Sequence, residues 1–175
     1  MQLNPYDLFR QAIVTPLGEM TAVTSDRGIV LFDFSDNAHL AREVNGLSRY
    51  LPGNRIVDGG HPLLTQLAAE IGEYFAGTRR EFGVPLHPVG TPFQLDVWAA
   101  LLTIPYGQTR SYADQARMIG RPTAVRAVAN ANGRNRLPIL IPCHRVIGSD
   151  GTLTGYSGGI CRKTELLRRE RSFKL

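Results

Sequence analysis

The chain has 175 residues, of which 43% are hydrophobic and 20% charged, and it carries two cysteines and a formal net charge of +5. These values are typical of a soluble globular protein with one sizeable core or two small ones. No stretch reaches the roughly 18 apolar residues that a membrane helix needs, and no basic segment leads into an apolar one at the N-terminus. We therefore expect neither a membrane span nor a signal peptide, and reduced thiols in the cytoplasm.

The charge is divided unevenly between the two halves of the chain. Residues 1–90 carry seven Arg and ten Asp or Glu, a net of −3, whereas residues 91–175 carry eleven Arg, two Lys and five acids, a net of +8. A basic half suggests one face for a polyanion, and arginine suits planar hydrogen bonding to phosphate. A run of charge is also often only a solvated surface, so charge alone leaves both interpretations open.

The first half of the chain predicts a small α/β domain, residues 1–83, without a catalytic constellation. Three β-prone runs are separated by the turn-forming segments Pro16-Leu17-Gly18 and Asp26-Arg27-Gly28, which favours an antiparallel meander. Two helical runs follow, and residues 84–90 are typical of an extended linker. The expected elements are strands over residues 11–15, 20–25 and 29–34 and helices over residues 38–50 and 62–75.

The second half, residues 91–175, predicts a mainly α-helical domain. It opens with a capping-box pattern, because Gln94 follows three residues after Thr91. The last helix has Leu166, Leu167 and Glu170 on one side and a basic second side that includes Lys163. Helices are expected from residue 91 and over residues 111–119, 122–132 and 163–171.

Two of these helices, joined by a tight turn at Gly120, predict a winged helix-turn-helix. The second helix carries Arg126, and Thr123, Ala124 and Ala127 keep one of its sides small. Small residues let a backbone approach a nucleic-acid groove closely, but they equally let a helix pack on another helix. The pattern alone leaves both uses open.

A candidate nucleophile follows the apolar run of residues 139–141, which we expect to be a buried strand. Cys143 and His144 place a thiol beside a proton acceptor. An unperturbed cysteine, with a pKa of about 8.5, is only slightly ionised at neutral pH, so a neighbouring group must take its proton. His144 could do so directly or through a water with a carboxylate behind the ring, although an isolated Cys-His pair is usually structural.

A series of motifs in the second half gives this pair its context. From about residue 93 to residue 170 the sequence resembles the DNA-repair alkyltransferases that act on 6-O-alkylguanine. The resemblance depends on the order and spacing of the motifs, since each one alone is weak. They are FQ at 93–94, VW at 97–98, IPYG at 104–107, TRSY at 109–112, RAV at 126–128, NGRN at 132–135, IPCHRV at 141–146 and GYSGG at 155–159.

The resemblance implies a reaction in which the protein transfers an alkyl group irreversibly to its own cysteine. Cys143 would be the acceptor, and His144 would act through a water as the base. Glu170 would orient the other side of the imidazole ring, because a carboxylate there fixes its tautomer and raises its basicity. Asn135 would brace the segment around the nucleophile, and Tyr112 would donate a proton to the guanine.

The same resemblance implies a pocket for an extruded base, since the target atom is hidden in the base stack. The backbone carbonyls of Cys143 and Val146 would accept the exocyclic amine of guanine. The loop residues Tyr156, Ser157 and Gly158 would form the pocket wall, with glycines that permit unusual backbone angles. The expected substrates are 6-O-alkylguanine and also 4-O-alkylthymine.

For DNA, the resemblance implies a sequence-independent approach through the minor groove of the duplex. Arg126 would fill the space of the flipped base, and Thr123, Ala124 and Ala127 would line the contact. We expect no cofactor, a monomer in solution, and room for cooperative binding on DNA. Because residues 1–90 contain no cysteine, we also expect no zinc site of the kind some relatives hold there.

The sequence departs from the family at two places, and three rival functions remain. Arg136 stands where many relatives have proline, and the resemblance assigns no role to Cys161. A protein that only recognises alkylated DNA would lack the acceptor cysteine, whereas Cys143 is present. A cysteine hydrolase would need a second half of its site, and a transcription factor would leave the Cys143 motif unexplained.

Overall fold

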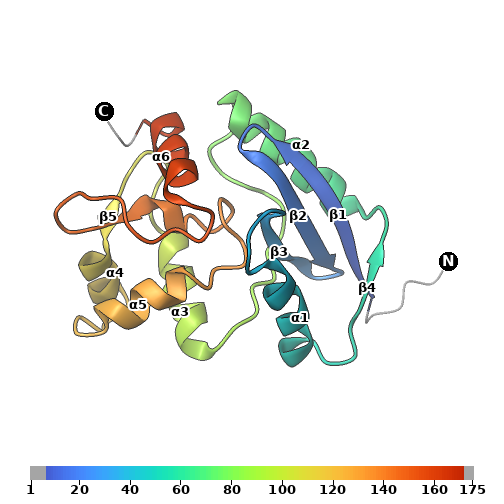
Figure 1. Cartoon of the computed structure of the whole chain (residues 1–175), viewed down its shortest axis with the longest axis horizontal. Helices are drawn as coiled ribbons and strands as arrows, with labels where there is room; N and C mark the ends of the chain where they lie inside the picture. The colour runs from blue at the N-terminus through green and yellow to red at the C-terminus, as the bar shows by residue number, and fades with distance from the viewer. Residues whose placement is uncertain (1–6, 172–175) are drawn as a thin grey trace. The chain divides into compact units, whose positions relative to one another are not determined.

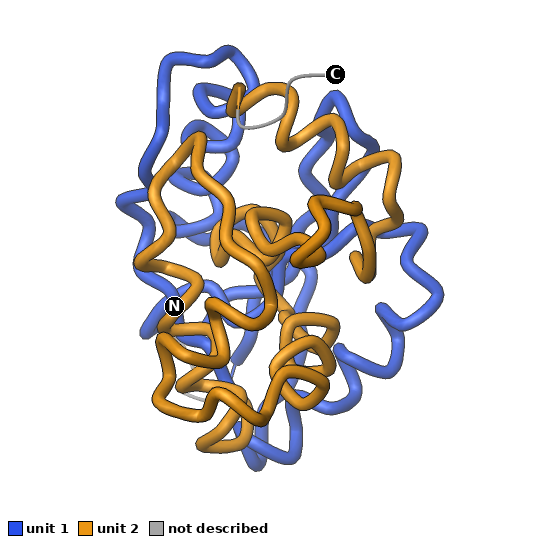
Figure 2. Tube along the Cα trace, turned by 90° about the vertical axis from the view of Figure 1, so that its left-hand side faces the viewer, with its two compact units in different colours: residues 1–89 blue, residues 90–175 orange. Residues whose placement is uncertain are grey.

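The computed structural model of the chain describes residues 7–171. The chain divides into two compact units, residues 1–89 and residues 90–175 (Figure 2). The first unit is built on a β-sheet and the second mainly on helices (Figure 1). None of the helices within residues 7–171 is long and apolar enough to cross a membrane.

Unit 1 contains a four-stranded sheet with the order β3-β2-β1-β4. The three strands expected from the sequence form the antiparallel meander. A fourth strand pairs in parallel with β1, so the sheet is mixed rather than wholly antiparallel. This strand has only four residues, and its charged ends, Arg55 and Asp58, obscure the alternating pattern that predicts a strand. The strands are β1 (Asp7–Thr15), β2 (Gly18–Ser25), β3 (Gly28–Phe34) and β4 (Arg55–Asp58).

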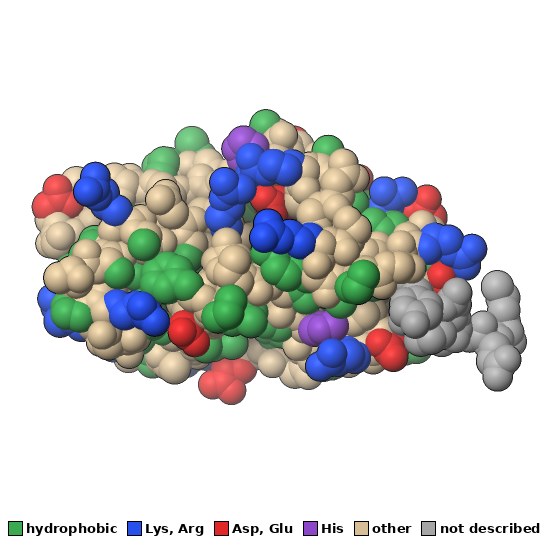
Figure 3. All heavy atoms as spheres, turned by 90° about the horizontal axis from the view of Figure 1, so that it is seen from below, with side chains coloured by type: hydrophobic (Ala, Val, Ile, Leu, Met, Phe, Trp, Pro, Cys, Tyr) green, Lys and Arg blue, Asp and Glu red, His purple; other side chains and the backbone are tan. Residues whose placement is uncertain are grey.

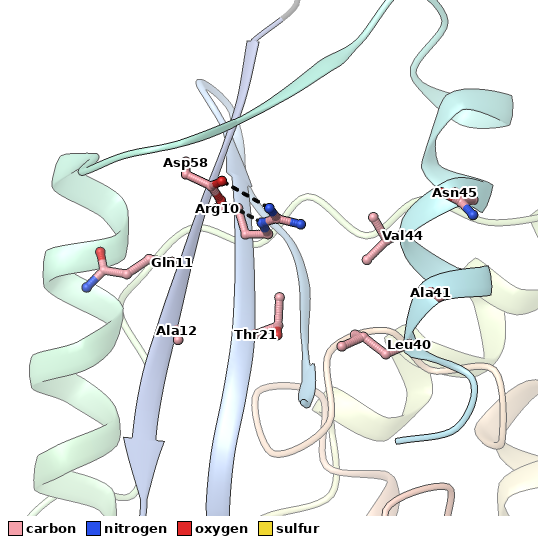
Figure 4. A pocket seen from close by; sticks show the side chains of 9 residues that line it. All are labelled: Arg10, Gln11, Ala12, Thr21, Leu40, Ala41, Val44, Asn45 and Asp58. Atoms are coloured by element: carbon pink, nitrogen blue, oxygen red, sulfur yellow. Dashed lines mark hydrogen bonds and ion pairs between the residues drawn. The ribbon is translucent and has the colours of Figure 1, made fainter. Parts of the chain in front are cut away.

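Two helices cover opposite faces of this sheet, α1 (Leu40–Tyr50) and α2 (Pro62–Ala76), close to the ranges expected. On one face, Leu47 of α1 packs in a cluster with Leu8 and Leu31. Figure 4 shows α2 on the far side of the sheet from α1. Beside α1 lies a pocket of about 640 Å³, which Arg10 helps to line. Arg10 is held there by an ion pair with Asp58 at 2.8 Å.

The segment after α2 pairs with the start of β3. The backbone N–H of Ile29 donates to Pro85 O at 2.9 Å, and that of His87 donates to Ile29 O at 2.8 Å. This stretch is extended, as expected, but it is bonded to the sheet rather than free. A Cβ atom at Gly28, whose φ is +149°, would lie 2.6 Å from Pro85 O, so the close approach requires glycine.

Unit 2 is mainly α-helical, as expected. Its first helix starts with the predicted capping box, in which Gln94 N donates to Thr91 Oγ1 at 3.2 Å and Thr91 N donates to Gln94 Oε1 at 3.0 Å. Two very short strands pair in parallel. The elements are α3 (Pro92–Leu102), β5 (Arg110–Ser111), α4 (Tyr112–Met118), α5 (Val125–Asn132), a 3₁₀ turn (Cys143–Arg145), β6 (Val146–Ile147) and α6 (Ile160–Arg169).

Helices α4 and α5 lie side by side and are joined by a short turn, which is the expected helix-turn-helix (Figure 1). Ser111, where this helix was expected to begin, caps α4, because Asp114 N donates to its hydroxyl at 3.0 Å. Helix α5 begins at Val125, later than the expected start at residue 122. The residues before it form a turn closed by Ala124 N, which donates to Arg121 O at 2.9 Å.

Buried polar contacts anchor the C-terminal end of α5. The indole N–H of Trp98 donates to Ala131 O at 2.9 Å, and Trp98 itself is a core residue, 2% exposed. The side-chain amides of Gln115 and Asn132 bond each other twice, at 3.1 and 2.6 Å. Gln115 also donates to Val97 O at 3.2 Å, so this amide pair joins α3, α4 and α5.

Candidate functional site

The segment that leads to Cys143 is a buried turn, and the expected strand over residues 139–141 is wrong. Ile139 has a φ of +73°, which a strand residue does not adopt. The backbone N–H of Ile141 donates to Leu137 O at 2.8 Å and closes the turn. Cys143 follows in the 3₁₀ turn and is 5% exposed. The sulfur is therefore positioned by a tight fold of the backbone.

Asn135 braces this turn on the side of the sulfur. Its side-chain amide donates to Cys143 Sγ at 3.2 Å and to Ile141 O at 2.8 Å, while its oxygen accepts from Leu137 N at 2.9 Å. A hydrogen bond donated to sulfur favours the thiolate over the thiol. The residue that the sequence assigns as a brace thus lies in direct contact with the candidate nucleophile.

His144 and Glu170 form a buried pair directly behind the candidate nucleophile. Their atoms Nε2 and Oε1 are 2.8 Å apart, and both side chains are fully buried. Burial lowers the pKa of His144, although Glu170 opposes this, so the imidazole is neutral at neutral pH. Because the carboxylate holds the hydrogen on Nε2, the atom left to accept a proton is Nδ1. That atom is buried and has no hydrogen-bond partner within residues 7–171.

Arg145 also binds the Glu170 carboxylate, a contact that was not expected from the sequence. Its guanidinium donates to Glu170 at 2.8 and 3.1 Å and to Ile104 O at 2.6 Å. Burial alone would raise the pKa of Glu170, but the hydrogen bonds from His144 and Arg145 and the charge of Arg145 outweigh it and hold that pKa well below its usual range. Glu170 is therefore an anion that keeps the imidazole in one orientation.

Tyr112, at the start of α4, contacts the loop that contains the GYSGG motif. Its hydroxyl donates to Thr154 O at 3.0 Å and to Gly155 O at 3.3 Å. Burial raises the pKa of Tyr112, and the charge of Cys143 raises it further, so the hydroxyl keeps its proton. A Cβ atom at Gly155 would lie 3.2 Å from that hydroxyl, which leaves little space for a larger residue.

The other residues expected in the pocket lie in the same part of unit 2. Val146 is fully buried in β6 and Tyr156 is 9% exposed, whereas Ser157 and Gly158 are partly exposed. The guanidinium of Arg162 donates to Gly158 O at 3.2 Å and ties the loop to α6. The residues expected at the site thus come from segments of unit 2 up to about sixty residues apart in sequence, from Tyr112 to Glu170.

Helix α6 differs from its expected form. It runs from Ile160 to Arg169 and is capped by Glu170. Lys163, expected on the basic outer side, is fully buried instead, so that expectation is wrong. Its spacing to Leu166, Leu167 and Glu170 places it on their stripe, a signal that was present in the sequence. Its Nζ donates to Val146 O at 2.5 Å and to Thr154 O at 2.8 Å.

The residues expected to touch DNA lie on α5 and in the turn before it. Thr123, Arg126 and Ala127 are exposed and Ala124 is partly exposed, while Val128 faces the core. The small side chains of Thr123 and Ala127 are thus not used to pack α5 within unit 2. Figure 3 shows one face of the molecule, on which Lys and Arg side chains are interspersed with acidic and hydrophobic ones.

Cys161 and two histidines of unit 1, His61 and His87, lie outside the group of contacts described above. Cys161 is exposed, Cys143 is buried, and they form no disulfide with each other. His61 caps α2 by accepting from Leu63 N at 3.2 Å. His87 bonds to Ser25 at 3.0 Å. Residues 7–171 contain no cluster of three or more His, Cys, Asp or Glu that could hold a metal ion.

Fold and site together define a two-unit protein whose helix-turn-helix unit holds a buried cysteine beside a histidine–glutamate pair. Two family models match it, described as the ribonuclease-like domain of 6-O-methylguanine DNA methyltransferase, over residues 8–88, and the DNA binding domain of the same, over residues 92–172. The chain belongs to the 6-O-methylguanine DNA methyltransferase family.

Individual relatives agree with this assignment. The constitutive methylated-DNA–protein-cysteine methyltransferase of Bacillus subtilis is 56% identical over 105 residues, a match that covers 60% of this chain and 62% of that relative. The corresponding protein of Methanosarcina barkeri is 40% identical over 93% of this chain and 97% of its own length. A Mycobacterium tuberculosis crystal structure in complex with DNA superposes with a TM-score of 0.78 at 40% identity and covers 95% of this chain and 93% of its own.

Proposed function

We propose that this chain repairs duplex DNA by transferring the alkyl group of 6-O-alkylguanine, and of 4-O-alkylthymine, to Cys143 in one irreversible event. The observation that carries the proposal is the buried series of contacts in which Asn135 bonds the sulfur and Glu170 bonds His144. Membership of the family and the names of the relatives in Bacillus and Methanosarcina support the same chemistry.

In this proposal, proton transfer activates the sulfur. Nδ1 of His144 takes the thiol proton through a water, while Glu170 holds the opposite nitrogen. The thiolate then attacks the alkyl carbon, the bond between that carbon and O6 breaks, and the electron pair stays on the guanine. The Tyr112 hydroxyl exchanges its hydrogen bond to Thr154 O for one to the leaving base and so stabilises the developing anion. The thioether formed has no labile bond, so each molecule reacts once.

The base reaches Cys143 only after it leaves the stack. We propose that the carbonyls of Cys143 and Val146 accept its exocyclic amine, and that Tyr156, Ser157 and Gly158 form the wall beside it. In support, Val146 directly follows the 3₁₀ turn of Cys143, and the Tyr112 hydroxyl bonds Thr154 O and Gly155 O, just before Tyr156. The pocket reads the guanine edge, which every alkylated guanine shares, rather than the neighbouring bases.

The exposed side of α5 is the surface we propose for DNA. Arg126 would enter the duplex and replace the flipped base, because a guanidinium can stack and still hydrogen-bond. Thr123, Ala124 and Ala127 would let the backbone approach the minor groove. The net charge of +8 over residues 91–175 supports salt-sensitive, sequence-independent binding. We further propose that the protein acts in the cytoplasm as a monomer in solution and without a cofactor.

A protein that only recognises alkylated DNA is the main alternative. It has no need of a sulfur that is hydrogen-bonded by Asn135 and adjacent in sequence to a neutral histidine. A cysteine hydrolase would turn over repeatedly, whereas alkyl transfer to sulfur stops after one event. A recognition protein would therefore form no adduct, and a hydrolase would process more than one substrate per molecule. One experiment distinguishes both from single alkyl transfer.

The experiment is to incubate the protein with duplex DNA that contains 6-O-methylguanine and to weigh the intact protein and its peptides. We expect one methyl group per molecule on the peptide that contains Cys143. Cys143→Ala should remain unmodified, and Cys161→Ser should react like the wild type. Methylation confined to Cys161, or more than one repaired base per molecule, would contradict the proposal.

A further inference from the structure

Lys163 is a buried cation to which the proposed reaction assigns no role. Its side chain is fully buried within unit 2, which is rare for lysine and unfavourable unless nearby groups bind the ammonium. Nζ donates to two backbone carbonyls, Val146 O at 2.5 Å and Thr154 O at 2.8 Å. These two hydrogen bonds offset part of the free energy lost when the ammonium is removed from water.

The two carbonyls belong to different segments of the candidate site. Val146 directly follows the 3₁₀ turn that holds Cys143, whereas Thr154 lies in the loop that also accepts the hydroxyl of Tyr112 at 3.0 Å. Nζ is 5.7 Å from the centre of the Tyr112 ring. The ammonium of Lys163 thus links the backbone next to the Cys143 turn to the loop proposed as the pocket wall.

The charge of Lys163 acts on the same groups. Burial lowers the pKa of Lys163 to about 8, and the thiolate of Cys143 opposes that decrease. The interaction is mutual, so the ammonium favours the thiolate. Lys163 also helps burial to lower the pKa of His144. The ionisable groups that interact with the ammonium are Cys143 and His144 of the 3₁₀ turn, through charge, and Tyr112 of α4, through its ring.

We propose that Lys163 is a positioning residue of the alkyl-acceptor site, whose ammonium ties the Val146 carbonyl to the Thr154 carbonyl and keeps a positive charge beside the Cys143 sulfur. The thiolate is then formed most readily when the pocket wall is in place. This inference rests on the proposed function for its biological meaning, but its effect on Cys143 is independent of any DNA substrate.

The first test measures the rate of Cys143 alkylation by iodoacetamide as a function of pH, in a Cys161→Ser background. In Lys163→Met, which keeps the length of the side chain but not its charge, we expect the midpoint to rise by about one pH unit and the rate at pH 7 to fall about tenfold. Lys163→Arg, which keeps the charge, should have a midpoint near that of the parent. Arg168→Met removes an exposed charge from the same helix and should change nothing.

A second measurement needs no variant at position 163 and decides the matter if Lys163→Met does not fold. The chain has two lysines, Lys163 and Lys174, so isotope-labelled lysine gives a two-signal NMR spectrum that Lys174→Arg assigns. When iodoacetamide removes the thiolate, the pKa of Lys163 should decrease, because the interaction is mutual.

An unchanged midpoint in folded Lys163→Met, or an unchanged Lys163 pKa after alkylation, would overturn this proposal. Methyl transfer from duplex DNA that contains 6-O-methylguanine is measured in parallel on the wild type. If the wild type does not react with that DNA while the iodoacetamide midpoint still shifts, the proposed function fails and the role of Lys163 stands.

Discussion

Replacing Glu170 by glutamine separates the charge of this residue from its shape. In the wild type, the carboxylate accepts from Arg145 at 2.8 and 3.1 Å and contacts His144 Nε2 at 2.8 Å. Glutamine has nearly the same volume but offers one acceptor oxygen and an amide group that faces these donors. The variant therefore leaves Arg145, whose side chain is 8% exposed, without its counter-charge.

The expected loss of stability follows from that burial. Removing one partner of a buried ion pair costs about 3–5 kcal/mol, and the hydrogen bond that glutamine retains favours the lower end, about 3 kcal/mol at pH 7. Because the pKa of Glu170 is lower in the folded protein, its contribution is fully present above the unfolded pKa of about 4.3. It is lost progressively as the pH falls from there towards the folded pKa.

The assay is guanidinium unfolding followed by the fluorescence of Trp98. This residue is the single tryptophan of the chain and is buried in unit 2, so it reports on the unit that contains Glu170. Glu165→Gln, which removes a partly exposed carboxylate from the same helix, is the matched control and should cost at most about 1 kcal/mol. A Glu170→Gln cost of less than about 1 kcal/mol at pH 7, or one that does not shrink below about pH 4, would refute the reasoning.

Three further variants test other parts of the argument. Arg126→Ala should reduce methyl transfer from duplex DNA at least tenfold more than reaction with free 6-O-benzylguanine, since only the duplex needs base flipping; equal losses would exclude that role. Asn135→Leu should slow the reaction of Cys143 with iodoacetamide and lower stability by about 1–3 kcal/mol, because the amide bonds to the sulfur and to Ile141 O are lost. Gln115→Leu should destabilise unit 2 by about 1–3 kcal/mol by leaving Asn132 buried without its partner, and adding Asn132→Leu should recover part of that loss; additive losses would show that the amide pair is not coupled.

Local signals in the sequence predicted much of the fold. The capping box at Thr91 depends on residues three positions apart, so it can be read without knowledge of the tertiary structure. The short strand β4 was not predictable in the same way, because its four residues are stabilised by pairing with β1, almost fifty residues away. The start of α5 was missed because the Ala124 turn competes with the first helical turn.

The sequence predicted which residues belong to the site better than it predicted the contacts between them. The adjacency of Cys143 and His144 is local, and the resemblance pointed to Glu170, which the structure places 2.8 Å from the imidazole. Lys163 was assigned to the outside because charged residues are rarely buried, and only the backbone carbonyls around it explain the exception. The buried turn at Ile139 was predicted as a strand because a buried turn and a buried strand can both be runs of apolar residues.

The backbone bonds between β3 and the segment after α2 also bear on how the sheet could pair with other molecules. An open strand edge is a template for intermolecular pairing, and this sheet covers part of each edge. Pro85 and His87 bond to Ile29 on one edge, and on the other edge the four-residue strand β4, with charged ends, pairs with the first four residues of β1. Because the contact at Gly28 allows no side chain, any larger residue there would loosen the covering segment. Aggregation of such a variant would then precede loss of the fold.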